Sequence, residues 1–251
     1  MRVDLNADVG ESFGPYTIGD DAGLMRSVTS VSVAAGFHGG DPGVLRRTIR
    51  LAKAHGLAVG AHPGFSDRQG FGRRDVFMSS QDVEDLVLYQ IAAVAGVAAA
   101  EGLRLGHVKP HGALYNMAAR DERLAEAIAR AVAAFDVSLT LFGLPGSRLL
   151  EAAGAAGLAT ATEGFADRAY AADGSLAPRT APGAVISDRE SAVAQTLRMV
   201  REGVVATLDG TMLPLDVQTV CVHGDTPDAA GLASRVRAGL ESAGILVAAL
   251  G

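Results

Sequence analysis

Short runs of β-branched and apolar residues alternate along the chain with longer stretches rich in Ala, Leu and Arg. Short apolar runs are typical of strands, whereas apolar residues at intervals of three and four are typical of helices. The pattern predicts strands at 2–7, 31–37, 57–61, 105–109, 137–142, 158–162 and 218–223, and a weaker strand at 204–208. It predicts helices at 42–55, 80–101, 121–135, 146–156, 188–202 and 227–241.

Capping residues mark the ends of several predicted helices. Asp41-Pro42 and Thr226-Pro227-Asp228 offer a side-chain cap with a proline in the first turn, and Ser79 offers a further cap. Glycines that allow a left-handed closing residue follow four helices, at Gly56, Gly102, Gly157 and Gly203. The alternation of strands and helices therefore indicates an α/β fold.

The length of 251 residues fits one α/β barrel, and no linker or shift in composition divides the chain. We expect a single domain over 1–251, a distorted βα barrel of about seven strands. Two connections, 62–79 and 163–187, are unusually long. Long loops on the carboxyl side of a sheet are usually functional.

The composition of the chain indicates where in the cell the protein is located and which kinds of partner it can bind. A net charge of -6 and a pI near 5.5 offer no basic surface, so we expect neither nucleic acid nor a membrane as a partner. The one cysteine, Cys221, cannot form an internal disulfide. The chain opens with a strand-like segment that leaves no room for a signal peptide, and the apolar stretch from Leu86 to Ala100 is expected to be too short for a bilayer. These features predict a cytoplasmic protein.

Five strand-like runs end abruptly in ionisable residues. Because the carboxyl ends of parallel strands face the same way, these ends should surround one mouth. The residues concerned are Asp8, His38, His62, Lys109, His111, His223 and Asp225. Four of the six histidines fall in this set, which favours a catalytic site.

Several long motifs resemble the LamB/YcsF family. They are Asp4-Leu5-Asn6-Ala7-Asp8-Val9-Gly10-Glu11-Ser12, Gly36-Phe37-His38, Gly60-Ala61-His62-Pro63, Val108-Lys109-Pro110-His111-Gly112-Ala113-Leu114-Tyr115-Asn116, Glu163-Gly164-Phe165-Ala166-Asp167-Arg168, Pro178-Arg179 and Cys221-Val222-His223-Gly224-Asp225. They occur in order from residue 3 to about 245. Ala35 departs from the pattern, because relatives often carry a cysteine there, and this argues against an essential thiol at that position.

The resemblance implies one subunit of an ATP-dependent 5-oxoprolinase, which opens 5-oxo-L-proline (pyroglutamate) to L-glutamate. It also implies a distorted seven-stranded βα barrel similar to that of polysaccharide deacetylases, ATP as a co-substrate and partner subunits. A homo-oligomer is a further possibility. The chain has no glycine-rich phosphate-binding motif. ATP therefore binds either by another route or in the partner subunits, and the sequence leaves both open.

Opening a lactam needs a base for water, groups that stabilise developing negative charge and an acid for the leaving nitrogen. Seven residues are the catalytic candidates: Asp8, His38, His62, Lys109, His111, Glu163 and His223. Lys109 is one of only two lysines beside twenty arginines, and a compact ammonium suits an oxyanion. A cap at Asp8, hydrogen bonds to turns for the histidines and a salt bridge for Lys109 remain the structural alternatives.

Five further residues are candidates for substrate binding: Asn6, Glu11, Arg73, Arg179 and Asp225. Asn6 shares a strand face with Asp8, and Arg179 suits a two-pronged contact with a carboxylate. Glu11 could instead be a solvated loop charge, and Asp225 could instead cap a helix.

Whether a metal binds is left open by the sequence. Asp8, His38 and His62 could form an Asp-His-His set, although no close ligand spacing supports it. Two other functions therefore stay possible, a metal-dependent deacetylase of small N-acylated sugars and a non-catalytic subunit that binds a small carboxylate.

Overall fold

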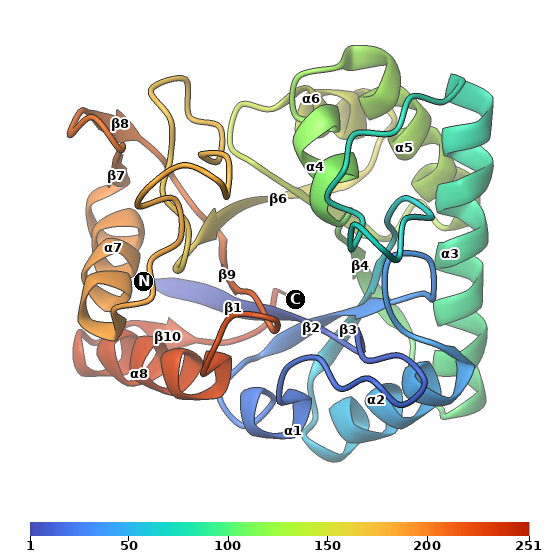
Figure 1. The fold of residues 1–251 in the computed structure, drawn as a ribbon, viewed down its shortest axis with the longest axis horizontal. Helices are drawn as coiled ribbons and strands as arrows, with labels where there is room; N and C mark the ends of the chain where they lie inside the picture. Colours follow the sequence, from blue (N-terminus) through green and yellow to red (C-terminus); the bar gives the residue numbers. More distant parts are fainter. Residues whose placement is uncertain (251) are drawn as a thin grey trace.

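The computed structural model describes residues 1–250, which form a closed barrel of seven parallel strands surrounded by helices (Figure 1). The barrel strands are β1 (Arg2–Val9), β2 (Ser30–Ala34), β3 (Ala58–His62), β4 (Leu105–Val108), β5 (Thr140–Gly143), β6 (Ala159–Phe165) and β9 (Thr219–Val222). They pair in chain order, and β9 closes the ring by pairing with β6 and β1. The predicted α/β barrel of seven strands is confirmed.

The helices are α1 (Asp21–Leu24), α2 (Pro42–Ala54), α3 (Ser80–Ala100), α4 (Gly112–Ala118), α5 (Glu122–Phe135), α6 (Arg148–Ala155), α7 (Arg189–Glu202) and α8 (Ala229–Ser242). Asp41 and Ser79 cap α2 and α3 through hydrogen bonds to backbone N–H groups, as the sequence predicts. The glycines at 56, 102, 157 and 203 all have positive φ, which confirms their helix-closing role.

Several elements differ from the sequence expectations. The weak strand at 204–208 is β7 (Val204–Ala206), which pairs antiparallel with β8 (Met212–Pro214) outside the barrel. The sequence does not predict β8, β10 (Leu246–Val247) or the short helices α1 and α4, because segments this short carry little periodicity. α8 begins at Ala229 rather than 227, since the Thr226 hydroxyl bonds Asp167 instead of capping the helix.

α3 is long and apolar enough, by length and composition alone, to cross a membrane. The expectation that this stretch is too short is therefore wrong. In the structure, one face of α3 is buried through Val83, Val87, Ile91 and Val94, and the helix packs on β3 and α5. A core helix of a soluble protein passes the same test, so the composition of α3 is weak evidence for a membrane span.

The inside of the barrel is polar along β1, and this polar face positions the site. Side chains of a strand alternate between its two faces. Asp4, Asn6 and Asp8 share one face, while Leu5 and Ala7 point to the other and join the apolar core. Asp4 accepts hydrogen bonds from the hydroxyls of Ser30 and Thr219 on the neighbouring strands. A column of polar groups thus runs through the barrel to its mouth.

Candidate active site

The carboxyl ends of the barrel strands surround a cavity of about 580 Å³. Seven of the twelve candidate residues line it: Asp8, His62, Arg73, Lys109, His111, Arg179 and His223. They come from strand ends far apart in the sequence and from both long loops, so the structure brings together what the strand-end pattern predicts. The volume lies in the usual range for small-molecule sites.

The other five candidates lie outside the lining of this cavity. Asn6 and Glu163 are buried within the barrel and contact Lys109. Glu11 and His38 are buried beside His111, and Asp225 forms an ion pair with Arg73. The cavity lining therefore does not include the substrate-binding candidates Asn6, Glu11 and Asp225 or the catalytic candidates His38 and Glu163.

Lys109 is the centre of a buried charge network. Its Nζ lies 2.7 Å from Asp8 Oδ1 and donates to Glu163 Oε1 and Asn6 Oδ1, each at 3.0 Å. Cys221 Sγ lies 3.1 Å from the same Nζ. Burial disfavours the charged amine, but Asp8 and Glu163 outweigh it and hold the pKa of Lys109 well above its usual range. The ammonium therefore already balances two carboxylates, which is the salt-bridge alternative for this residue.

Asp8 stays ionised at the mouth of the barrel. Burial alone would raise the pKa of Asp8, but His62 and Lys109 lower it well below the usual value. Its Oδ2 lies 3.5 Å from His62 Nε2. Its Oδ1 makes no hydrogen bond of ordinary geometry within residues 1–250, although Lys109 is close. Asp8 therefore stays charged beside Lys109 and can accept a hydrogen bond from a ligand or a water molecule.

His223 is held by a buried carboxylate. Its Nδ1 lies 2.9 Å from Asp167 Oδ1, and the Thr226 hydroxyl donates to Asp167 Oδ2 at 2.7 Å. Burial would raise the pKa of Asp167, but the interaction with His223 lowers it, so the carboxylate is charged. The imidazole stacks on Phe165 at 5.3 Å between ring centroids. A carboxylate at Nδ1 leaves Nε2 as the nitrogen that can exchange a proton with a ligand.

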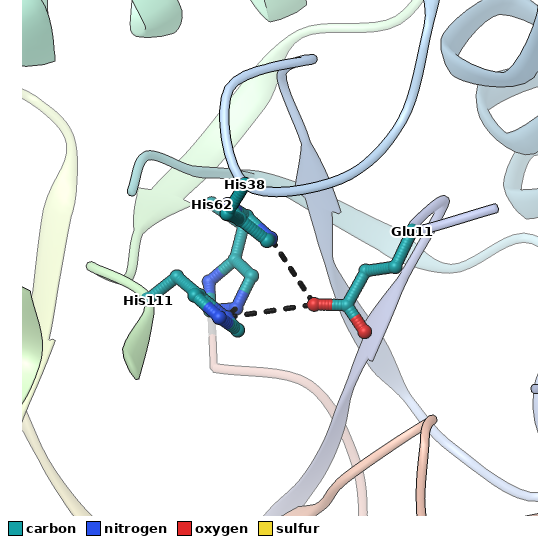
Figure 2. Close-up of side chains that lie close together, drawn as sticks. All are labelled: Glu11, His38, His62 and His111. Carbon is teal, nitrogen blue, oxygen red and sulfur yellow. Dashed lines mark hydrogen bonds and ion pairs between the residues drawn. The ribbon is translucent and has the colours of Figure 1, made fainter. Parts of the chain in front are cut away.

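Another group of buried side chains, which we call the histidine cluster, is shown in Figure 2. It consists of Glu11, His38, His62 and His111. His38 Nε2 lies 3.1 Å from Glu11 Oε1, and the His38 and His111 rings stack at 3.6 Å between centroids. Burial lowers the pKa of His38 and of His111 well below the usual value and raises that of Glu11. Glu11 is 3% exposed, so its interpretation as a solvated loop charge is wrong.

Two groups of side chains bring metal-capable atoms within 4.8 Å of one another. One is Glu11, His38, His62 and His111, and the other is Asp8, Cys221 and His223. The expected Asp-His-His set is not among them, because Asp8 and His38 belong to different groups. The sequence does not reveal this division, since it cannot show which strand ends face each other.

Arginines surround the rest of the cavity. Arg73 Nη2 lies 2.8 Å from Asp225 Oδ2, which ties the first long loop to the segment after β9. Arg168 donates to the carbonyls of Ala177 and Ala184, and thus holds the second loop together. Arg179 is half-buried, and no carboxylate within residues 1–250 pairs with it. It is the arginine best placed to bind an anionic ligand.

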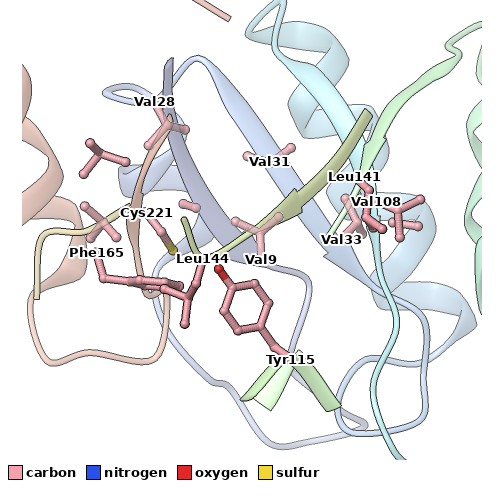
Figure 3. Packing of buried hydrophobic residues seen from close by; sticks show 14 of the residues in the cluster. Val9, Val28, Val31, Val33, Val108, Tyr115, Leu141, Leu144, Phe165 and Cys221 are labelled. Atoms are coloured by element: carbon pink, nitrogen blue, oxygen red, sulfur yellow. The ribbon is translucent and has the colours of Figure 1, made fainter. Parts of the chain in front are cut away.

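Tyr115 and Asp167 are site residues that sequence reasoning did not select. Tyr115 lines the cavity, and its ring lies 5.8 Å from that of Phe165 (Figure 3). Its buried hydroxyl has no hydrogen bond of ordinary geometry within the described residues. Both residues lie inside family motifs, but Tyr115 is on the unpredicted helix α4 and Asp167 lies in the second long loop just after β6.

Comparison with known proteins gives a consistent family relationship. The LamB/YcsF family model matches residues 3–251. A 5-oxoprolinase subunit of Methylococcus capsulatus is 57% identical over 99% of this chain and 96% of the relative. The crystal structure of a lactam utilization protein from Thermus thermophilus superposes with a TM-score of 0.94 at 51% identity, over 100% of both chains.

More distant structures share the fold alone. Peptidoglycan deacetylase PdaC from Bacillus subtilis has a TM-score of 0.50 at 12% identity, and the match covers 98% of this chain and 86% of that one. Such a likeness supports the barrel type and carries no information about substrate.

Proposed function

Because this chain belongs to the LamB/YcsF family, we propose that it acts as one subunit of a 5-oxoprolinase and opens the lactam ring of 5-oxo-L-proline. The observation that carries the proposal is the pairing of His223 with Asp167 at the wall of a cavity that also holds Asp8. The proposed substrate rests on the family relationship, and the proposed hydrolysis rests on the side chains of the site.

Asp8 and His223 are placed to activate one water molecule. One side-chain atom of each lies within 4.8 Å of the other. Two groups up to about 5.5 Å apart can share a water at ordinary hydrogen-bond lengths. His223 takes the proton through Nε2, since Asp167 holds Nδ1 and stabilises the imidazolium that forms. The same proton then passes to the ring nitrogen as the C–N bond breaks.

The lactam carbonyl needs activation, because its amide is stabilised by resonance. Transfer of the γ-phosphoryl group of ATP to the lactam oxygen, with release of ADP, would create a better electrophile for water. When the C–N bond then breaks, the phosphoryl group remains on the new carboxyl group, and a second water releases phosphate and glutamate. We propose that partner subunits carry out this step and that ATP is their co-substrate, since this chain has no glycine-rich phosphate-binding motif. A cytoplasmic location, where ATP is available, fits this arrangement.

Arg179 is proposed to hold the negative charges of the substrate. The planar guanidinium can bind a carboxylate or a phosphoryl group through two N–H donors. Burial lowers the pKa of Arg179 and the nearby Arg73 lowers it further, although Asp225 already neutralises Arg73. Lys109 is proposed to have an indirect role: its ammonium lies beside Asp8 and keeps that carboxylate charged.

The test is a reconstituted reaction with the partner subunits, 5-oxoproline and ATP, in which glutamate and phosphate are both measured. His223→Asn should lower the rate of glutamate release by about 10²- to 10⁴-fold, the range of general acid–base catalysis. The matched control is His55→Asn, because His55 is exposed at the end of α2 and does not line the cavity. Equal rates for the two variants would refute the role of His223.

A metal-dependent deacetylase stays the alternative on account of the buried histidine cluster, whose side chains could hold a metal ion. Release of acetate from small N-acetylated sugars, with no glutamate from 5-oxoproline under any condition, would favour it over the lactam reaction.

A further inference from the structure

Two imidazole nitrogens face each other at short range in the histidine cluster. His62 Nε2 and His111 Nδ1 lie 2.9 Å apart. At this distance two nitrogens need a proton or another cation between them, because their lone pairs would otherwise repel.

Hydrogen bonds at the far side of each ring fix where the protons are. His62 Nδ1 lies 2.7 Å from the carbonyl oxygen of Lys109, and His111 Nε2 lies 2.8 Å from that of Phe71. A carbonyl can only accept, so each of these nitrogens carries the ring proton. In the neutral rings, His62 Nε2 and His111 Nδ1 are therefore both bare lone pairs. Backbone carbonyls that orient imidazoles in this way are typical of metal ligands.

Glu11 supplies a third ligand atom of the right type. Its Oε1 lies 3.5 Å from His111 Nδ1 within the same buried group. With metal–ligand bonds of about 2.0–2.1 Å, neighbouring ligand atoms of a tetrahedral zinc site are about 3.3 Å apart. The observed separations of 2.9 and 3.5 Å bracket that value. We propose that Glu11, His62 and His111 bind one divalent transition-metal ion.

His38 belongs to the surroundings of this site rather than to its ligands. Its ring is parallel to that of His111 within 2°, with centroids 3.6 Å apart. An ion in the plane of His111 would lie well off the plane of His38, farther than a bond of about 2.1 Å allows. His38 Nε2, 3.1 Å from Glu11 Oε1, instead donates to the carboxylate and orients it.

Two imidazoles and one carboxylate form the ligand set of catalytic zinc sites, in which a fourth position stays open. His62 and His111 also line the cavity, so the ion would lie at its inner wall. This inference goes beyond the proposed function, in which no step uses a metal. It can be tested on the isolated chain without any lactam, so its failure and the failure of the proposed reaction are separate results.

The experiment is calorimetric titration of the chelator-treated full chain with Zn²⁺, together with metal analysis of the dialysed protein. We expect one Zn²⁺ per chain. Glu11→Gln and His62→Gln each change a ligand, so they should weaken binding by more than the roughly 10- to 100-fold that loss of a residue behind a ligand typically causes. Their melting temperatures in chelator, compared with the parent chain, show whether the variants are folded; Glu11→Asp, which keeps a carboxylate, should recover part of the affinity.

Two further variants test whether Zn²⁺ binds to the proposed ligands, to His38, or to the group of Asp8, Cys221 and His223. His38→Phe keeps the stacking on His111 and should weaken Zn²⁺ binding clearly less than His62→Gln does, whereas an equally large loss would overturn the assignment. His223→Asn tests the group of Asp8, Cys221 and His223 and should leave binding unchanged. Absence of stoichiometric Zn²⁺ at micromolar concentration would overturn the proposal and leave a shared proton between the two imidazoles.

Discussion

The Lys109 ammonium is enclosed between the carboxylates of Asp8 and Glu163. Removal of one partner from a buried charge pair leaves an uncompensated charge and typically costs about 3–5 kcal/mol. We therefore expect Lys109→Met to lower the free energy of unfolding by about this amount and to abolish turnover. The sequence predicts Lys109 as a charge that faces the substrate and has little structural part, and the geometry revises that view.

Urea denaturation of purified variants measures this effect. The other lysine, Lys53, is exposed, so Lys53→Met is the matched control and should cost less than about 1 kcal/mol. Glu163→Gln combined with Lys109→Met removes one of the stranded charges and should recover part of the loss. A stability of Lys109→Met equal to that of the control would contradict the buried network.

His107 makes the protein sensitive to acid at the level of a single residue. Burial, followed by the charge of Lys109, lowers the pKa of His107 from 6.5 to about 3. Between these values the unfolded chain binds a proton that the folded protein does not. The free energy of unfolding therefore falls as the pH drops from 6.5 to about 3, by at most about 1.4 kcal/mol per pH unit for one proton.

Denaturation curves at about pH 7, 5 and 4, which span the window between the two pKa values, test this prediction with His107→Gln as the comparison. The variant loses the stack on Phe142, so it should be less stable at neutral pH, but its stability should fall less steeply with acid. Parallel pH profiles for the two proteins would show that His107 does not titrate in this window.

At the level of elements, a glycine in β3 makes room for a side chain of β4. A methyl group added at Gly60 would overlap the imidazole of His107 on the neighbouring strand. Gly60→Ala should therefore cost about 1–3 kcal/mol, as overpacking of a core does. Gly106, also in this pair of strands, has open space around it, so Gly106→Ala should change stability by less than about 0.5 kcal/mol. Thermal melting of the two variants compares them directly, and equal melting temperatures would be incompatible with the contact.

The arrangement of the site depends on the residue at which each strand ends. β2 stops at Ala34 rather than at 37, because Gly36 and Gly40 adopt positive φ and turn the chain. This early stop places His38 in a turn, where it stacks on His111 instead of pointing along its strand. The exact end of one strand therefore decides which histidines meet.

For the whole molecule, the main prediction concerns partnership. We expect the isolated chain to show little or no ATP-dependent release of glutamate from 5-oxoproline, since activation of the lactam is proposed to occur on partner subunits. The measurement is a coupled assay for phosphate and glutamate at micromolar protein, with and without the partners. Stoichiometric release by the chain alone would place the nucleotide site inside this barrel.

Much of this protein can be predicted from its sequence by itself. The alternation of strand and helix patterns predicts the barrel, because each element carries its own periodicity and caps. The ionisable residues at strand ends predict a cavity at the carboxyl face, because parallel strands bring these ends together. Family motifs add the relationship to LamB/YcsF proteins.

Only the tertiary structure decided how these residues are partnered. Glu11, His62 and His111 lie at or just after the ends of three different strands, and no spacing along the chain shows that their atoms come within 4.8 Å. The same holds for Asp167 behind His223 and for the carboxylates around Lys109. The physical reason is that local periodicity determines on which face of a strand a side chain lies, whereas barrel closure and loop geometry determine which side chains meet across the mouth.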